Sequence, residues 1–468
     1  MKKKLSFVID NLLIKSILKF NLIRKFFIKY VVKKYEKEVG SYTIKNKSPK
    51  FTLAALNDAD KRFIWLAKNA AQENINLIHI PRILLSKVFK YIFIDNGYSP
   101  DNKGDLGETS PVLFYDKKYL KYRKRYKKYC ENLLINLIEI YKLDVLLLPK
   151  LNDDWIIDLI KASKSLNLKL VVHDREHGLI KNRMEIYPEY LKKIINDLIV
   201  DKLFLTNKKH LEFWERSNFP KNKMVITGKP DIDYWKSFNK KQKLKNIRNI
   251  SPKLNNKKIK IIFFAFGRYN YLNFFYPGEN RTWEPLANDF HNVIKKLLEK
   301  YHEKIQIIYK IGGKPTRDSF PGFKEFVSCL NNYINNSSLI IMDQKYSTLE
   351  LLSISDAVIG FHTLGIIEAM FTEQPIFYGG WGNLFNDIKD TLIPFHNYKG
   401  LTHVKNEYLL FKTVEDFINN PNNFKLEFKN IKAREKERSE MYFKPDGNSS
   451  KRIINEIKKI MNKKRVPN

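Results

Sequence analysis

Cysteine is nearly absent from this chain of 468 residues, which contains only Cys130 and Cys329. The two are far apart and no CxxC pair exists, which argues against a disulfide framework and against a cysteine-rich zinc site. A reducing compartment is the natural place for such a chain. We therefore predict a cytoplasmic protein.

Long uncharged hydrophobic runs are also missing. No stretch approaches the roughly 18 consecutive apolar residues that indicate a transmembrane helix, so we expect none. The apolar N-terminal stretch is interrupted by Lys15, Lys19, Arg24, Lys25 and Lys29, and no small-residue cleavage site follows it. This pattern is not that of a secretory signal peptide.

Acidic residues are outnumbered, with 50 Asp and Glu against 85 Lys and Arg, a formal net charge of +35. Such a charge favours anionic partners, including nucleic acid, anionic lipid and phosphorylated substrates. A general bias of the chain toward Lys, Asn and Ile would explain the same excess. Zinc-finger spacing and RNA-binding motifs are absent from the sequence, so we expect no nucleic-acid partner.

The first fifty residues are a basic, amphipathic segment for which we predict helix. Apolar residues such as Leu18, Leu22 and Phe26 recur at near-helical spacing, with Lys and Arg between them. Helices of this type lie in the interface of anionic membranes, which would give residues 1–40 a peripheral contact with the inner face of the cytoplasmic membrane. Packing of the segment on the body of the protein is the alternative.

From Phe51 onward, short apolar strands alternate with helical stretches, a pattern that predicts βαβ units and parallel sheets. The expected strands of the first series cover residues 51–56, 75–80, 144–148, 169–173, 203–206 and 224–227. The second series covers residues 259–264, 305–310, 339–342, 357–360 and 375–378. We predict an α/β chain with Rossmann-like domains at 51–235 and 259–440, a linker at 236–258 and a C-terminal helical segment at 441–468.

Open parallel sheets bind ligands beyond the carboxyl ends of their strands. The expected strand 357–360 is followed by His362 and Thr363 in a turn, by Gly365 at a helix start and by Glu368 one turn later. A helix start suits a phosphate, and Glu368 is suited to accept hydrogen bonds from ribose hydroxyls. We predict a nucleotide-binding segment here. An ordinary turn capped by Thr363 is the alternative.

Two other strands of the second series run into glycine and cations. Gly267 and Arg268 follow the strand 259–264, and Lys310 ends the strand 305–310. A glycine permits close approach of a diphosphate, and the cations would neutralise charge on a leaving nucleotide. Solvated cations in polar loops are the alternative interpretation.

Titratable residues gather after the strand 169–173 of the first series. Asp174, Glu176 and His177 are each eligible as the base that removes a proton from an acceptor hydroxyl, because such a group must lie within hydrogen-bond reach of the substrate. A structural or substrate-positioning role is the alternative. No second cluster of ligands supports a metal site, so we predict none.

Four segments carry a family resemblance. The turn Thr227–Asp233 resembles the end of the first domain in GT-B glycosyltransferases of bacterial surface-polysaccharide synthesis, of capsule or lipopolysaccharide. Residues 173–178 are similar to an acidic turn of those enzymes and of the UDP-N-acetylglucosamine 2-epimerases, which share the fold. Residues 356–375 resemble the donor segment of the transferases, and residues 442–453 resemble their C-terminal end.

The resemblance implies two Rossmann-like domains facing each other, with the donor nucleotide bound mainly by the second, the acceptor mainly by the first, and a terminal helix returning to the first. It implies a glycosyltransferase that moves a sugar from a nucleotide-sugar to a surface-glycan or lipid-linked acceptor, with no metal or further cofactor. The alternatives are a nucleotide-sugar 2-epimerase on the same fold and a non-catalytic, membrane-associated nucleotide-binding protein of glycan assembly.

Overall fold

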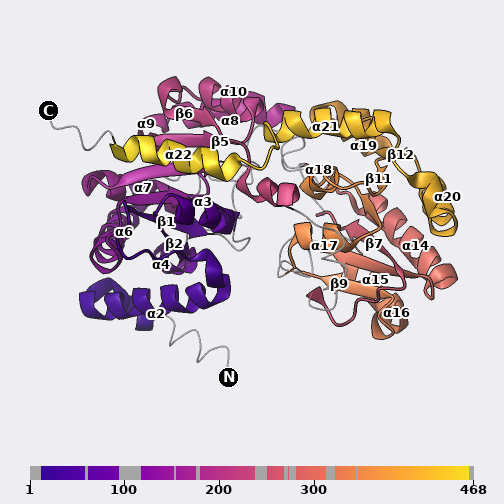
Figure 1. Cartoon of the computed structure of the whole chain (residues 1–468), viewed down its shortest axis with the longest axis horizontal. Helices are drawn as coiled ribbons and strands as arrows, with labels where there is room; N and C mark the ends of the chain where they lie inside the picture. The colour runs from indigo at the N-terminus through magenta and orange to yellow at the C-terminus, as the bar shows by residue number, and fades with distance from the viewer. Residues whose placement is uncertain are drawn as a thin grey trace. The chain divides into compact units, whose positions relative to one another are not determined.

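The computed structural model describes residues 12–57, 62–93, 117–151, 154–174, 180–237, 250–267, 272, 281–311, 322–343 and 346–462. The chain forms two compact units (Figure 1). The first contains Met1–Leu179, Arg183–Lys236 and Tyr442–Asn468, and the second contains Ile180–Asn182 and Ser237–Met441. Each unit has one six-stranded sheet in which every pairing is parallel, so the predicted α/β class with two Rossmann-like domains is confirmed.

The sheet of the first unit has the strand order β2-β1-β3-β4-β5-β6. Its strands are near-continuous apolar runs, as expected where helices cover both faces of a parallel sheet. The strands are β1 (Thr52–Asn57), β2 (Asn76–Pro81), β3 (Val145–Leu148), β4 (Lys169–Asp174), β5 (Lys202–Leu205) and β6 (Met224–Ile226). The helices are α2 (Asn21–Val39), α3 (Ala67–Gln72), α4 (Ile83–Phe93), α6 (Leu120–Tyr141), α7 (Asp154–Ser165), α8 (Lys181–Lys192), α9 (Ile195–Leu198), α10 (Lys208–Arg216) and α22 (Ser449–Asn462).

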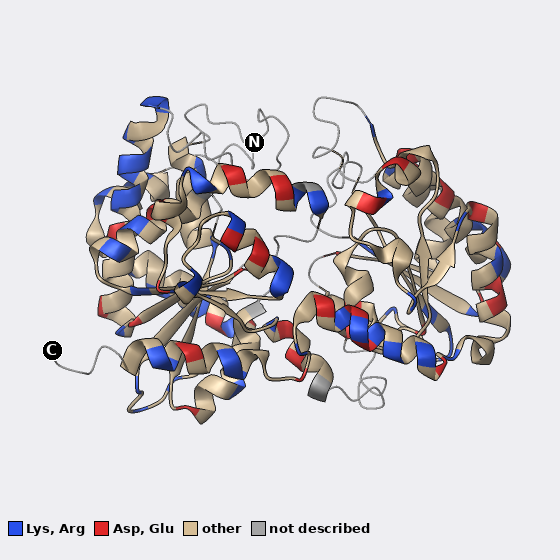
Figure 2. Cartoon of the chain, turned by 90° about the horizontal axis from the view of Figure 1, so that it is seen from above, with Lys and Arg blue, Asp and Glu red and all other residues tan. Residues whose placement is uncertain are grey.

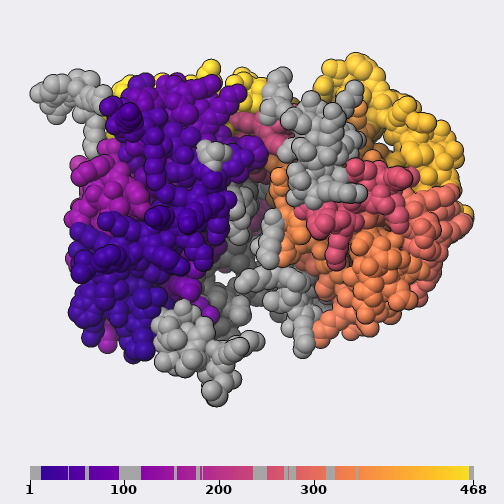
Figure 3. All heavy atoms as spheres, turned by 60° about the horizontal axis from the view of Figure 1, so that its bottom comes forward, coloured from indigo at the N-terminus to yellow at the C-terminus, as the bar shows by residue number. Residues whose placement is uncertain are grey.

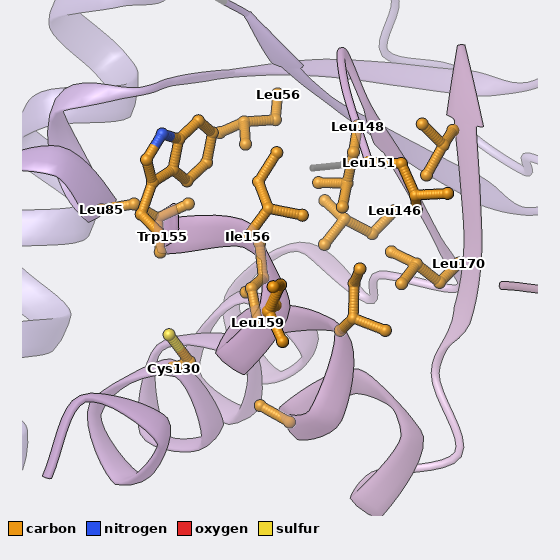
Figure 4. Packing of buried hydrophobic residues seen from close by; sticks show 14 of the residues in the cluster. Leu56, Leu85, Cys130, Leu146, Leu148, Leu151, Trp155, Ile156, Leu159 and Leu170 are labelled. Atoms are coloured by element: carbon orange, nitrogen blue, oxygen red, sulfur yellow. The ribbon is translucent and has the colours of Figure 1, made fainter. Parts of the chain in front are cut away.

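Alternate residues of each strand enter two different cores, because successive side chains point to opposite faces of a sheet. Leu146 and Leu148 of β3 join a large cluster with α4, α6 and α7. In Figure 4 the ring of Trp155, on α7, lies beside Leu56 and Leu85 in this cluster. Val145 and Leu147 point into the smaller cluster on the other face, which α3 and α22 cover.

The C-terminal helix α22 belongs to the first unit and buries Ile453, Ile454 and Ile457 against its sheet. Asp233 caps the helix: its two carboxylate oxygens accept hydrogen bonds from the amides of Ser449 (2.9 Å) and Ser450 (2.7 Å). These contacts tie the Thr227–Asp233 turn to the end of the chain.

Gly228, in the same turn, has a φ of +83°. A Cβ atom at this position would lie 2.6 Å from Ser449 Oγ and 3.0 Å from the carbonyl oxygen of Phe443. Backbone geometry and close packing therefore both require glycine here.

At the N-terminus, α2 follows a shorter helix of residues 12–19. Arg24 is buried and joins the two, because its guanidinium donates hydrogen bonds to the carbonyls of Ile17 (2.9 Å) and Leu18 (3.1 Å). One face of α2, including Ile28 and Val32, enters the large core, so the segment packs on the first unit. Within the described ranges, no helix is long and apolar enough to cross a membrane.

The sheet of the second unit has the order β9-β8-β7-β10-β11-β12. Its strands are β7 (Ile259–Phe264), β8 (Ile305–Lys310), β9 (Leu339–Met342), β10 (Ala357–Gly360), β11 (Ile376–Gly379) and β12 (Thr402–Val404). The helices are α14 (Glu284–Tyr301), α15 (Phe323–Cys329), α16 (Asn331–Asn335), α17 (Thr348–Ile354), α18 (Leu364–Ala369), α19 (Asn383–Ile388), α20 (Glu407–Asn419) and α21 (Phe428–Tyr442). The strand order reverses at β7, where β8 lies on one side and β10 on the other.

Candidate functional site

The carboxyl ends of β7, β8 and β10 are the place where this topology favours a ligand, because loops diverge where the strand order reverses. The register aligns Phe264 of β7 with Lys310 on one side and with Gly360 on the other. Gly267, predicted to face a diphosphate, is half-buried in the chain that leaves β7. The three predicted donor-site segments therefore begin from three adjacent strands.

Lys310 is the last residue of β8, and its side chain is buried. Its ammonium donates a hydrogen bond of 2.7 Å to the carbonyl of Asp343, which directly follows β9. Burial lowers the pKa of Lys310, while the carboxylates of Asp343 and Glu368 act in the opposite direction. The structure thus brings Lys310 and Glu368 together, although 58 positions separate them in the sequence.

Thr363 is the N-cap of α18 and its hydroxyl accepts a hydrogen bond of 3.3 Å from the amide of Gly365. This is the capping interaction expected for threonine before a helix. Thr363 and Glu368 are both half-buried, so part of each side chain is open to solvent. With only six residues, α18 is a short helix, and Glu368 lies in its last turn.

Gly365 allows close packing inside the unit. A Cβ atom at this position would lie 2.8–2.9 Å from ring atoms of Phe264, well inside van der Waals contact. The space beside the Gly365 backbone is therefore filled by the Phe264 ring at the end of β7. Through this contact α18 packs against β7, the strand that precedes Gly267.

His362 is buried beside Phe395, with 5.2 Å between ring centroids. Its Nε2 atom accepts a hydrogen bond of 3.0 Å from the amide of Ile393, and burial lowers its pKa to about 3. The ring is therefore neutral at physiological pH. Its described contacts hold the turn after β10 against the segment that contains Ile393 and Phe395.

Of the predicted catalytic residues of the first unit, Asp174 is described, and it is the last residue of β4. Asp174 is fully buried, and its Oδ2 atom accepts a hydrogen bond of 2.6 Å from Trp214 Nε1. The preceding residue, His173, contacts the carbonyl of Gly228 through Nε2 at 2.8 Å. Both side chains thus connect β4 to other parts of the unit. Glu176 and His177, and Arg268 of the second unit, lie outside the described residues.

Two residues with important contacts were not predicted. Asp343 follows β9 directly, so the strand-end rule could have found it as a neighbour of Lys310. Asp233 belongs to the quoted turn, but its contact with α22 joins residues more than 200 positions apart, and no local pattern reports it. Among the residues that the structure describes, no group of three His, Cys, Asp or Glu side chains is placed to hold a metal ion.

Comparisons by sequence find neither a matching family model nor a matching curated protein. By structure, the chain is similar to a variant of the wall teichoic acid polymerase TagF, with a TM-score of 0.53 and 15% identity over 95% of this chain and 97% of that one. It also matches a UDP-GlcNAc 2-epimerase from Neisseria meningitidis bound to UDP-GlcNAc, with a TM-score of 0.49 and 16% identity over 87% and 99% of the two chains. At this identity the first likeness shows the fold, which is of the GT-B type.

Proposed function

We propose that the chain is a glycosyltransferase that moves a sugar from a nucleotide-sugar donor to a surface-glycan or lipid-linked acceptor. The observation that carries the proposal is the electrostatic interaction of Glu368, on α18, with Lys310 at the end of β8, beside the point where the strand order of the second unit reverses. A cation suits the phosphates of a nucleotide, and a carboxylate suits its ribose hydroxyls.

In this proposal the second unit binds the donor. Lys310 and Arg268 face the diphosphate, Gly267 and the capped turn at Thr363 approach it through backbone amides, and Glu368 accepts hydrogen bonds from the ribose hydroxyls. Because Lys310 is buried, its charge acts on a phosphate with little screening by water. These cations would stabilise the leaving group without a metal ion.

The reaction would be a displacement at the anomeric carbon. The acceptor hydroxyl oxygen forms the new bond to that carbon, the bond to the nucleotide phosphate oxygen breaks, and the electron pair leaves on the phosphate. A base takes the hydroxyl proton. We assign this role to Glu176 or His177, and we assign to Asp174 the positioning of the loop start, since its carboxylate is bound by Trp214.

The acceptor class rests on the likeness in fold to a wall teichoic acid polymerase and on the family resemblance of the sequence. A lipid-linked acceptor would place the enzyme in the cytoplasm, at the inner face of the membrane.

The proposal is tested first by binding. Thermal-shift measurements with UDP, GDP, CMP, ADP and TDP should raise the unfolding temperature with one or two of these nucleotides, because a ligand that binds only the folded state stabilises it by mass action. If none of the five stabilises the protein, the donor site is wrong.

The stabilising nucleotide then selects the candidate sugar donors. Incubation of a donor with the protein alone, followed by NMR, should leave the sugar unchanged, and transfer should begin only when an acceptor is added. Inversion at C2 of the sugar without acceptor would show the epimerase instead. Nucleotide binding with neither reaction, over a panel of lipid-linked and oligosaccharide acceptors, would favour the non-catalytic binding protein.

A further inference from the structure

The N-terminal helix α2 has two apolar faces, and only one of them is used in the fold. Ile28 and Val32 lie on the buried face. Leu22, Phe26 and Tyr30 are spaced four residues apart and are offset by two positions from the buried row. At 100° per residue, that offset places them on the opposite side of the helix. They are 67%, 67% and 66% exposed. We call Leu22, Phe26 and Tyr30 the outward row.

Exposed apolar side chains are concentrated in this part of the molecule. Half of the large hydrophobic side chains that are exposed in the described ranges fall between residues 12 and 30. The rest are scattered singly or in pairs over both units, as is normal for a protein surface. Figure 3 shows the N-terminal segment, in the darkest indigo, on the surface that faces the viewer. A concentrated apolar row that the fold leaves exposed indicates a binding surface.

Lysines flank the outward row. Lys29, Lys33 and Lys37 form a parallel row on α2, and all three are exposed. Within the part of the chain that the structure describes, none of the three has an ion pair. No Asp or Glu occurs between Leu12 and Tyr35, and the two that follow in α2, Glu36 and Glu38, lie at its last turn beside Lys37. Elsewhere, as Figure 2 shows, Lys and Arg lie on helices of both units with Asp and Glu among them. The outward side of α2 is therefore apolar and cationic together.

We propose that α2 binds the surface of an anionic lipid bilayer, with the outward row in the interface and the lysine row at the headgroups. An interfacial helix needs one apolar side and cations beside it, and the outward side of α2 has both. A second copy of the chain fits poorly, because two identical cationic faces repel each other. The inference gives a contact surface to the membrane location proposed above, but it needs no sugar transfer.

The test is sedimentation of the full-length protein with vesicles of phosphatidylcholine alone or with one-third phosphatidylglycerol. We expect binding to the anionic vesicles only, weakened by high salt. Changing the outward row to glutamine (Leu22→Gln, Phe26→Gln and Tyr30→Gln together) should weaken it by about tenfold or more. Replacing the lysine row (Lys29→Gln, Lys33→Gln and Lys37→Gln) should also weaken it and reduce its dependence on salt.

A matched control lies on α20 in the second unit, where Tyr408 and Leu409 are exposed apolar neighbours. Changing both to glutamine should leave vesicle binding unchanged. Because the outward row is exposed, its variant should keep the wild-type melting temperature, and its stabilisation by nucleotide should also be unchanged. That second measurement separates failure of membrane binding from failure of the donor site.

Three outcomes would overturn the proposal. The wild-type protein does not sediment with anionic vesicles, or the outward-row variant sediments as well as the wild type. Alternatively, the wild-type protein forms a concentration-dependent dimer that the outward-row variant loses, with no binding to vesicles, which would assign the face to self-association.

Discussion

Both units place polar side chains at the carboxyl ends of their parallel strands, but the surroundings of these side chains differ between the units. In the first unit, Asn57, His173 and Asp174 end or nearly end their strands, and all three are buried with hydrogen bonds to other parts of that unit. In the second unit, Lys310 is buried at a strand end, but Glu368, whose carboxylate acts on it, keeps part of its side chain exposed.

A position at a strand end makes a side chain a candidate for ligand binding. It does not decide whether the side chain binds a ligand or stabilises the fold. Burial and partners decide it: a side chain whose polar atoms are bound within its own unit contributes to the fold. Lys310 donates one hydrogen bond within its own unit, to the carbonyl of Asp343, but an ammonium has three N–H groups. With Glu368 beside it only half-buried, the described strand ends of the second unit offer the better ligand site. Substitutions at these positions should break or sharpen the difference between the units, whereas acid should destabilise both units alike.

Acidification should have the largest effect. His79 of the first unit and His291 of the second are both buried, and burial lowers the pKa of each to about 4. An unfolded histidine has a pKa of about 6.5, so the unfolded chain takes up protons first as the pH falls. Each histidine should remove roughly 3 kcal/mol of stability between about pH 6.5 and pH 4. Urea denaturation over this range measures the loss.

The contribution of the first unit can be isolated. His79 accepts a hydrogen bond from Asn57 at Nδ1 (2.7 Å) and donates one to the carbonyl of Tyr42 from Nε2 (3.0 Å). The variant His79→Gln retains a hydrogen-bond donor and an acceptor but does not titrate in this range. Its loss of folding stability on acidification should therefore be smaller by about 3 kcal/mol. His403→Gln, at an exposed position, is the control. An undiminished loss in His79→Gln would contradict the assignment.

Lys310→Met should have the next largest effect, and its readout is function. Removing one buried cation from a phosphate site costs about 100-fold in rate or more, so kcat/KM for the donor should fall by that order. Lys304→Met is the matched control, because Lys304 is exposed at the opposite end of the same strand. If both variants keep wild-type nucleotide binding, the site is not at the end of β8.

Gly365→Ala should destabilise the second unit by about 1–3 kcal/mol, since its Cβ atom would lie within 3 Å of the Phe264 ring. Chemical denaturation measures this, and a second change, Phe264→Leu, should recover part of the loss. Gly360→Ala is the control: its Cβ atom would meet Ile366 at 3.4 Å. Equal effects of the two alanines would show that the Phe264 contact is not the cause.

Asp233→Ala should have the smallest effect, about 1 kcal/mol, confined to the first unit. It removes the acceptor for the amides of Ser449 and Ser450 at the start of α22. Hydrogen exchange should show faster opening of α22 while α20 of the second unit is unaffected. Asp233→Asn, which keeps one acceptor oxygen, should lie between the wild type and the alanine variant.

The fold class was predictable because the strands are compact apolar runs. Strands β7, β8, β9 and β10 have the predicted bounds, since their buried faces require a sequence pattern that is visible locally. The short strand β12 was missed: Thr402, His403 and Val404 have no such pattern, and their pairing with β11 forms the strand.

The candidate site was predictable only in part. Lys310 and Glu368 could be named from their strands and turns, but their proximity depends on the strand order, which the sequence does not state. The role of Gly365 depends on the Phe264 ring, about one hundred residues earlier. In α2, Leu22 and Ile28 are equally apolar, so the pattern could not tell the exposed row from the buried one.

The position of α22 has a consequence for synthesis of the chain. The small core of the first unit contains Leu53 and Ala55 from its first strand together with Ile453 and Ile457 from the last helix. The ribosome must therefore synthesise the chain as far as Ile457 before that core can close, whereas most of the second unit is one continuous stretch, Ser237–Met441. The first unit, whose synthesis begins first, is thus expected to finish folding last. One apolar face of its sheet stays exposed while the second unit folds.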